Sequence, residues 1–283
     1  MFERLSRSWQ LVKASGSVLR ADPELMLFPL ISSLAAVVVM LAFALPVFGL
    51  ASLDGMNGDS PALSLAGFAL AFLFYVSLYF VIFYFNAALV GAAMIRFGGG
   101  DPTLKDGLRI ANTKLMPILG YAFMAATVGM ILRAIQERVG FIGKMIVGML
   151  GAGWTVATYL VVPILVTRDV GPMDAVKESA AILKKTWGEN IVGQAGIGGV
   201  FWLIYVLIIL IGIALVVAAS ASGSGLLVGL AFLAVLVTFV AAALAQAALA
   251  GIYSAALYCY ATDPSGNHGF DAEALKLAFS PKN

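Results

Sequence analysis

The residues best suited to catalysis and metal binding are rare in this sequence. The chain of 283 residues has one histidine, His268, and one cysteine, Cys259. Zinc and haem sites are usually built from several His or Cys side chains, so we predict no metal and no other cofactor. The sequence also has no Gly-x-Ser-x-Gly nucleophile motif and no Walker phosphate-binding loop. These features favour a protein that is not an enzyme.

A second group of chemically useful residues is polar but uncharged. Asn86, Thr155 and Gln246 lie 16 to 18 residues before prolines that follow predicted membrane spans. This spacing predicts a similar depth in the membrane for all three. Gln194 adds an amide near the start of another span. Hydrogen bonds between helices explain such residues most simply. The alternative is a polar core that binds or conducts a small neutral or zwitterionic solute.

Basic residues form the third group. They occur on three segments where apolar residues recur at the three- and four-residue spacing of an amphipathic helix. Such helices suit the cytoplasmic membrane surface, where anionic lipid headgroups meet Lys and Arg. We therefore predict a surface for membrane lipids, mainly anionic ones, or for a protein partner or a second copy of the chain. The net charge of +2 argues against nucleic acid. The residues of this surface are Arg4, Arg7, Lys13, Arg20, Lys105, Arg109, Lys177, Lys184 and Lys185.

The elements that carry these residues are predicted to be transmembrane helices. Hydrophobic residues make up 61% of the chain and charged residues 11%, whereas a soluble domain has about 25% charged residues. A span needs about 20 apolar residues, and the small-residue segment 220–225 divides the longest charge-free stretch into two. We therefore predict an all-α fold, a polytopic transmembrane helical bundle of about six spans. The charge-free stretches are residues 25–53, 60–95, 115–132, 145–167 and 190–262.

The distribution of Lys and Arg predicts the orientation of the chain. The two termini and alternate loops carry fourteen of the 17 basic residues. Because cytoplasmic loops are enriched in Lys and Arg, we expect both termini in the cytoplasm. The exceptions are Arg133, Arg138 and Lys144. Either they form a basic patch in an outer loop, or the third and fourth charge-free stretches are not simple spans.

A pattern of surface helix and hairpin occurs three times along the chain. Each unit has a basic amphipathic helix and two spans, and the second span ends before a turn that contains proline. We predict one membrane domain over residues 1–283, built of units at about 1–98, 99–169 and 170–263, with a cytoplasmic tail at 264–283. A chain of alternating spans and basic inner loops would show a similar pattern without true repetition.

Three short motifs point to a known group of proteins. They are Arg7-Ser-Trp9-Gln-Leu-Val-Lys13, Leu27-Phe-Pro29 and Tyr84-Phe-Asn86-Ala-Ala-Leu-Val-Gly91. With them the chain resembles, over essentially its whole length, an uncharacterised bacterial family of six-span membrane proteins, a domain of unknown function. Its units are more loosely similar to the membrane domain fused to some glycerophosphodiester phosphodiesterases, whose catalytic domain has no counterpart here. The resemblance implies a bacterial inner-membrane location and no phosphodiesterase activity.

Three functions are consistent with these features. The first is a non-enzymatic protein that binds lipid or a partner through its basic helices. The second is a permease or channel that uses the polar level, by which we mean the shared depth of Asn86, Thr155 and Gln246. A lipid-modifying enzyme ranks third, because no segment near the membrane surface has paired carboxylates or clustered histidines. Asp101, Asp169 and Asp263 recur after the even spans, where helix capping explains them better.

Overall fold

The computed structural model describes residues 15–57, 61–185 and 187–262. This part of the chain is helical and has no strand. Six of its segments are long and apolar enough to cross a membrane, which confirms the predicted all-α polytopic fold. They are α2 (Leu27–Asn57), α3 (Pro61–Phe97), α5 (Leu115–Arg138), α6 (Phe141–Ala157) with its continuation α7 (Val161–Thr167), α9 (Trp187–Ala221) and α10 (Gly225–Thr262).

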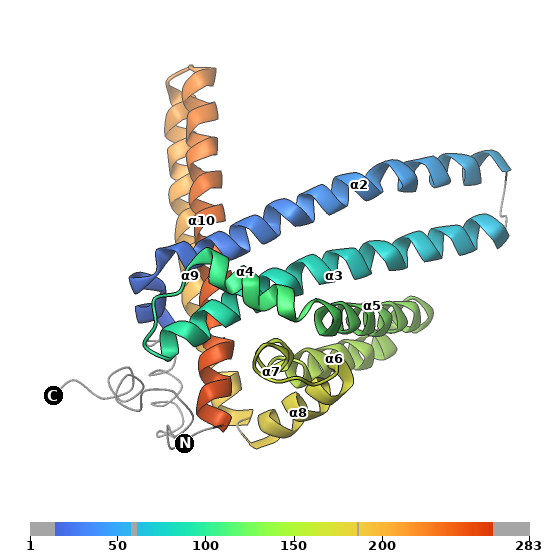
Figure 1. Ribbon diagram of the computed structural model, residues 1–283. Helices are drawn as coiled ribbons and strands as arrows, with labels where there is room; N and C mark the ends of the chain where they lie inside the picture. Colours follow the sequence, from blue (N-terminus) through green and yellow to red (C-terminus); the bar gives the residue numbers. More distant parts are fainter. Residues whose placement is uncertain (1–14, 58–60, 186, 263–283) are drawn as a thin grey trace.

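The long helices pair into three hairpins, α2–α3, α5–α6 and α9–α10 (Figure 1). Two short helices, α4 (Leu104–Thr113) and α8 (Pro172–Lys185), connect one hairpin to the next. A single turn of 3-10 helix, η1 (Pro23–Met26), precedes α2. The order of short helix and hairpin is therefore visible in the described part of the chain, whereas the boundaries of three repeated units stay a prediction.

Proline and glycine set several helix ends. Pro23, Pro61 and Pro172 are the first residues of η1, α3 and α8. Proline is favoured there because the N–H at this position has no partner within the helix, so its absence costs no hydrogen bond. Gly223 has a φ of 69° in the turn between α9 and α10. Glycine adopts such an angle without steric cost, and this turn divides the longest apolar stretch within the segment that was predicted to divide it.

The three hairpins pack together at one end, which we call the base. The base consists of the buried parts of α3 (87–93) and α10 (251–259), together with α7, Leu25 and Phe28. Small residues in these helices allow the backbones to approach closely. A Cβ atom added to Gly251 of α10, for example, would lie 2.5 Å from Leu89 Cδ2 of α3. The tightest packing therefore holds the hairpins at their shared end.

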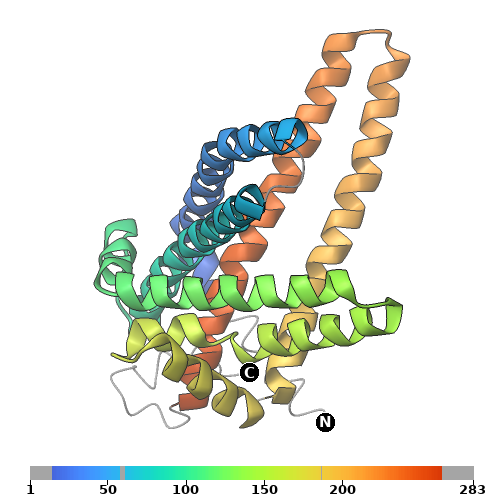
Figure 2. The same cartoon turned by 90° about the vertical axis from the view of Figure 1, so that its right-hand side faces the viewer.

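Away from the base the hairpins diverge and point in three directions (Figures 1 and 2). Their outer parts expose large apolar side chains, such as Leu45 (80%) and Phe48 (71%) on α2 and Leu226 (73%) on α10. Soluble monomers rarely expose continuous apolar surface of this extent, whereas lipid-facing helices require it. The helices thus meet at the base and present their outer parts for contact with lipid.

Candidate functional site at the base

Helix α4 presents basic residues on one side and buries small residues on the other. A capping box starts the helix: the Asp106 N–H donates to Thr103 Oγ1, and the Asp106 carboxylate accepts from the Thr103 backbone. Gly107 is buried so closely that an added Cβ would lie 2.5 Å from the Ala88 carbonyl oxygen of α3. Lys105 and Arg109 are exposed, and Arg109 Nη2 lies 2.8 Å from the Asp106 carboxylate.

Helix α8 has the same division of its surface. Ala175, Ser179 and Leu183 are buried, and the Ser179 hydroxyl accepts a hydrogen bond of 3.1 Å from the Leu160 N–H. This bond fixes α8 to the break between α6 and α7. Lys177 is exposed and lies 3.4 Å from the Asp174 carboxylate.

The remaining predicted basic residues have different positions. Lys184 is exposed on α8, and Arg20 is exposed on the helical residues 15–21 before η1. The predicted site residues Arg4, Arg7 and Lys13, and the side chains of Lys185 and Gln194, lie outside the described residues.

A buried ion pair joins the two ends of the first hairpin. Asp22 precedes η1 and is 4% exposed, and its carboxylate accepts two hydrogen bonds from the Arg96 guanidinium at the end of α3. Asp101, which is 90% exposed, lies 2.6 Å from the same guanidinium. Bidentate contacts of this kind fix direction as well as distance. The pair therefore holds the start of α2 against the end of α3.

A second ion pair joins the two ends of the middle hairpin. Lys114 precedes α5, and its ammonium donates to the Asp169 carboxylate (2.5 Å) and to the Arg168 carbonyl (3.0 Å) after α7. Arg168 in turn pairs with Glu178 of α8. The first and second hairpins are thus both closed at the base by oppositely charged residues that flank their helices.

Two carboxylates outside the spans have lowered pKa values. Hydrogen bonds from the Thr103 hydroxyl and backbone hold the pKa of Asp106 below its ordinary value. The hydrogen bond from Lys114, followed by its positive charge, lowers the pKa of Asp169. Both carboxylates are therefore ionised at neutral pH and balance part of the positive charge of the base.

The predicted polar level has a different neighbour for each residue. Asn86 lies where α3 meets α10, with its Oδ1 3.0 Å from the position of an added Cβ on Gly251. Gln246 Oε1 accepts a hydrogen bond of 2.6 Å from the Tyr205 hydroxyl of α9. Thr155 is exposed, and its hydroxyl donates to the Gly151 carbonyl of its own helix. Among the described residues, no hydrogen bond joins two of these three side chains.

Comparison with known families decides which group the chain belongs to. A family of unknown function, DUF6159, matches residues 65–270. The chain belongs to this family. The match runs from α3 to beyond α10, so it includes both short helices and every ion-paired residue of the base described above except Asp22. No curated protein matches the chain.

Membership of DUF6159 confirms the resemblance inferred from the motifs and assigns no activity. In the described part of this DUF6159 chain, no three His, Cys, Asp or Glu side chains are placed to hold a metal ion together. The base combines exposed cations, which can bind anionic groups, with ion pairs, of which Asp22–Arg96 is the most buried.

Sequence reasoning missed Asp22 and Glu178 as parts of the base. A signal for Asp22 was present, because oppositely charged residues flank the first predicted hairpin: Asp22 precedes it and Arg96 ends it. Lys114 and Asp169 flank the middle hairpin of this DUF6159 member in the same way. Glu178 lies within α8, and only the fold shows that Arg168 reaches it.

Proposed function

We propose that this protein binds anionic phospholipid through the basic residues around its base, and that it does so without catalysing a reaction. The observation that carries the proposal is the exposure of Lys105, Arg109, Lys177 and Lys184 on two helices that bury their small and apolar residues. The apolar hairpins extend from this base (Figure 1). The exposed cations would therefore lie at the level of the lipid headgroups.

We further infer that the base lies on the cytoplasmic side of a bacterial inner membrane, with both termini in the cytoplasm. The excess of Lys and Arg in the termini and alternate loops supports this orientation. Anionic lipids give the cytoplasmic leaflet a negative surface potential that attracts such residues. The orientation and the proposed ligand are consistent with each other.

The experiment compares lipid preference before and after removal of positive charge. Lys105→Gln and Lys177→Gln variants, single and combined, are placed in nanodiscs of phosphatidylglycerol and phosphatidylcholine, and the lipids that stay bound are counted by native mass spectrometry. Each cation near the surface contributes about 1 kcal/mol, so each change should lower the preference for the anionic lipid about five-fold. The preference should also weaken as salt is added.

The matched control is Arg138→Gln, which removes one exposed positive charge at the far end of the middle hairpin. This variant should keep the wild-type preference between the two lipids. An unchanged preference in the Lys105 and Lys177 variants would rule out lipid binding at the base. Loss of a co-purifying protein from the same variants would then favour a partner as the ligand.

A permease that uses the polar level is the second proposal. Its support is the position of Asn86 at the contact of α3 with α10, next to the base that all hairpins share. Proteoliposomes loaded with a panel of small neutral and zwitterionic solutes would test it. Uptake that is abolished by Gln246→Leu and kept by Ser222→Leu, a change in the exposed α9–α10 turn, would favour the permease over lipid binding.

A further inference from the structure

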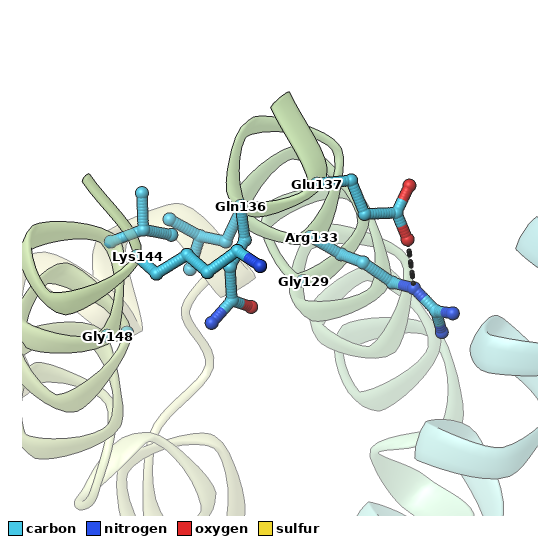
Figure 3. A pocket seen from close by; sticks show the side chains of 9 residues that line it. Gly129, Arg133, Gln136, Glu137, Lys144 and Gly148 are labelled. Atoms are coloured by element: carbon cyan, nitrogen blue, oxygen red, sulfur yellow. Dashed lines mark hydrogen bonds and ion pairs between the residues drawn. The ribbon is translucent and has the colours of Figure 1, made fainter. Parts of the chain in front are cut away.

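A pocket of about 530 Å³ lies between α5 and α6, near the turn that joins them (Figure 3). Its volume is in the range of small-molecule sites. Leu132 and Gln136 line it from α5, and Lys144, Val147 and Gly148 line it from α6. The pocket contains none of the residues of the polar level and lies away from the base. It is a separate feature of the molecule.

The glycines that line this pocket leave space instead of bringing the helices together. Small residues on membrane helices normally permit close helix contact. A Cβ added to Gly148, however, would meet nothing within 4 Å, and one added to Gly151 would meet only Leu132, at 3.8 Å. The glycines of α6 thus leave room for a ligand between the two helices.

The polar groups of the pocket suit an anion. Lys144 and Gln136 point toward one another across the gap (Figure 3). Arg133 and Glu137 also line the pocket. Their charged groups point away from Lys144 and pair with each other (3.0 Å), and the Arg133 guanidinium also donates to the Tyr75 hydroxyl (2.9 Å). Within the described residues, the Lys144 ammonium has no ion pair. An ammonium and an amide therefore face the space.

The surroundings of the pocket favour a membrane lipid as the source of the anion. Helix α5 has 24 residues, which corresponds to about 36 Å and slightly exceeds the hydrocarbon thickness of about 30 Å. The pocket lies at its far end, where the lipid phosphates of the leaflet opposite the base would be. Beside the pocket, α6 exposes Phe141 (85%) and Ile142 (69%), two apolar side chains that acyl chains would cover.

We infer that this pocket binds the phosphate of a membrane phospholipid. Lys144 and Gln136 donate to the phosphate, and Leu132 and Val147 contact the glycerol and the first carbons of the acyl chains. This site gives a reason for one basic residue near the α5–α6 turn, Lys144, against the charge distribution of the rest of the chain. It lies at the opposite end of the molecule from the lipid surface of the proposed function and does not depend on it.

The experiment fills the pocket and compares a matched change on the same helix. The Gly148→Leu change would place a side chain in the open space of the pocket. The matched change is Gly153→Leu, because an added Cβ at Gly153 also meets nothing within 4 Å but Gly153 does not line the pocket. Protein is released from phosphatidylglycerol nanodiscs, and tightly held lipids are counted by native mass spectrometry. Gly148→Leu should retain one lipid fewer than the wild type, and Gly153→Leu should retain the wild-type number.

Lys144 is tested by charge removal and rescue. Lys144→Gln should reduce occupancy of the same lipid at least five-fold, and Lys144→Arg should restore most of it. Equal lipid numbers in the Gly148→Leu and Gly153→Leu variants would overturn the proposal. Equal lipid occupancy in the wild type and Lys144→Gln would also overturn it, because the ammonium would then not hold the lipid phosphate.

Discussion

At the scale of single residues, the Asp22–Arg96 pair has the most buried carboxylate among the ion pairs of the described residues. Its carboxylate is 4% exposed and the guanidinium 26%, so both groups have lost much of their hydration. A buried pair adds little net stability compared with apolar residues, but removing one partner leaves the other charge without compensation. The pair therefore specifies how α2 meets α3 more than it strengthens the fold.

Asp22→Asn should reduce the free energy of unfolding by about 3 kcal/mol, because Arg96 would stay partly buried without its closest carboxylate. Unfolding by denaturant in detergent micelles measures the change. The control is Asp101→Asn, which removes the second carboxylate on the same guanidinium, one that is 90% exposed. Equal losses in the two variants would show that burial of Asp22 does not determine its contribution.

The Lys114–Asp169 pair should make the stability of the protein depend on pH in the acidic range. Lys114 lowers the pKa of Asp169 in the folded state, so the pair stabilises the protein above the ordinary Asp pKa of about 3.9. This stabilisation is lost as the pH falls through the lowered folded-state pKa. Asp169→Asn should therefore destabilise the protein at pH 6 and lose less stability on acidification than the wild type. Thermal unfolding between pH 6 and strongly acidic conditions measures both effects.

The matching variant is Lys114→Gln, which should flatten the same part of the pH profile. The double variant should behave like Lys114→Gln, because that change already removes the interaction with Asp169. Additive losses in the double variant would contradict a direct coupling between the two side chains.

At the scale of elements, the contact of α4 with α3 depends on a residue that has no side chain. An added methyl at Gly107 would lie 2.5 Å from the Ala88 carbonyl oxygen and 2.6 Å from Phe28 Cζ. A backbone atom cannot move aside as a flexible side chain can. The short helix would have to shift away from α3, and its basic residues would move with it.

Gly107→Ala should therefore destabilise the protein by about 1 to 3 kcal/mol, the usual cost of overpacking. The control is Gly153→Ala on α6, where the added methyl meets nothing. Because alanine is the better helix former, the control should be neutral or slightly stabilising. Denaturant unfolding compares the two, and a neutral result at Gly107 would show that α4 adapts to the larger residue.

The fourth span shows a detail of element structure that hydropathy does not reveal. Its apolar stretch is continuous in sequence, but the helix is interrupted between α6 and α7, at residues 158–160. Ser179, from a helix later in the chain, accepts the Leu160 N–H at this break. The interruption is thus stabilised by a residue outside the span.

At the scale of the whole molecule, the hairpins share one base and present their outer parts separately. Tight packing at small residues and the ion pairs act at the base, whereas the outer parts expose apolar side chains. With the base on the cytoplasmic side, the turns of all three hairpins would lie on the opposite side. The basic turn of the middle hairpin would then lie on that opposite side as well.

Cysteine labelling should establish this arrangement. In a Cys259→Ala background, which removes the single cysteine, a membrane-impermeant maleimide added to intact cells should label Ser222→Cys and Arg138→Cys. It should label Lys105→Cys only after the cells are permeabilised. These sites are exposed in the α9–α10 turn, at the end of α5 and on α4. An Arg138→Cys variant protected in intact cells would show that the middle hairpin does not cross the membrane.

The sequence by itself determined the number of long helices, the turn at Gly223 and the basic residues on α4 and α8. The bilayer sets these features locally, because a span must be apolar over about 20 residues and must satisfy its own backbone hydrogen bonds. Only the tertiary structure decided that Asp22 meets Arg96, that Gly107 lies on Ala88 and that a pocket opens between α5 and α6. Such contacts depend on how distant helices pack at small residues, and neither periodicity nor hydropathy along the chain encodes that packing.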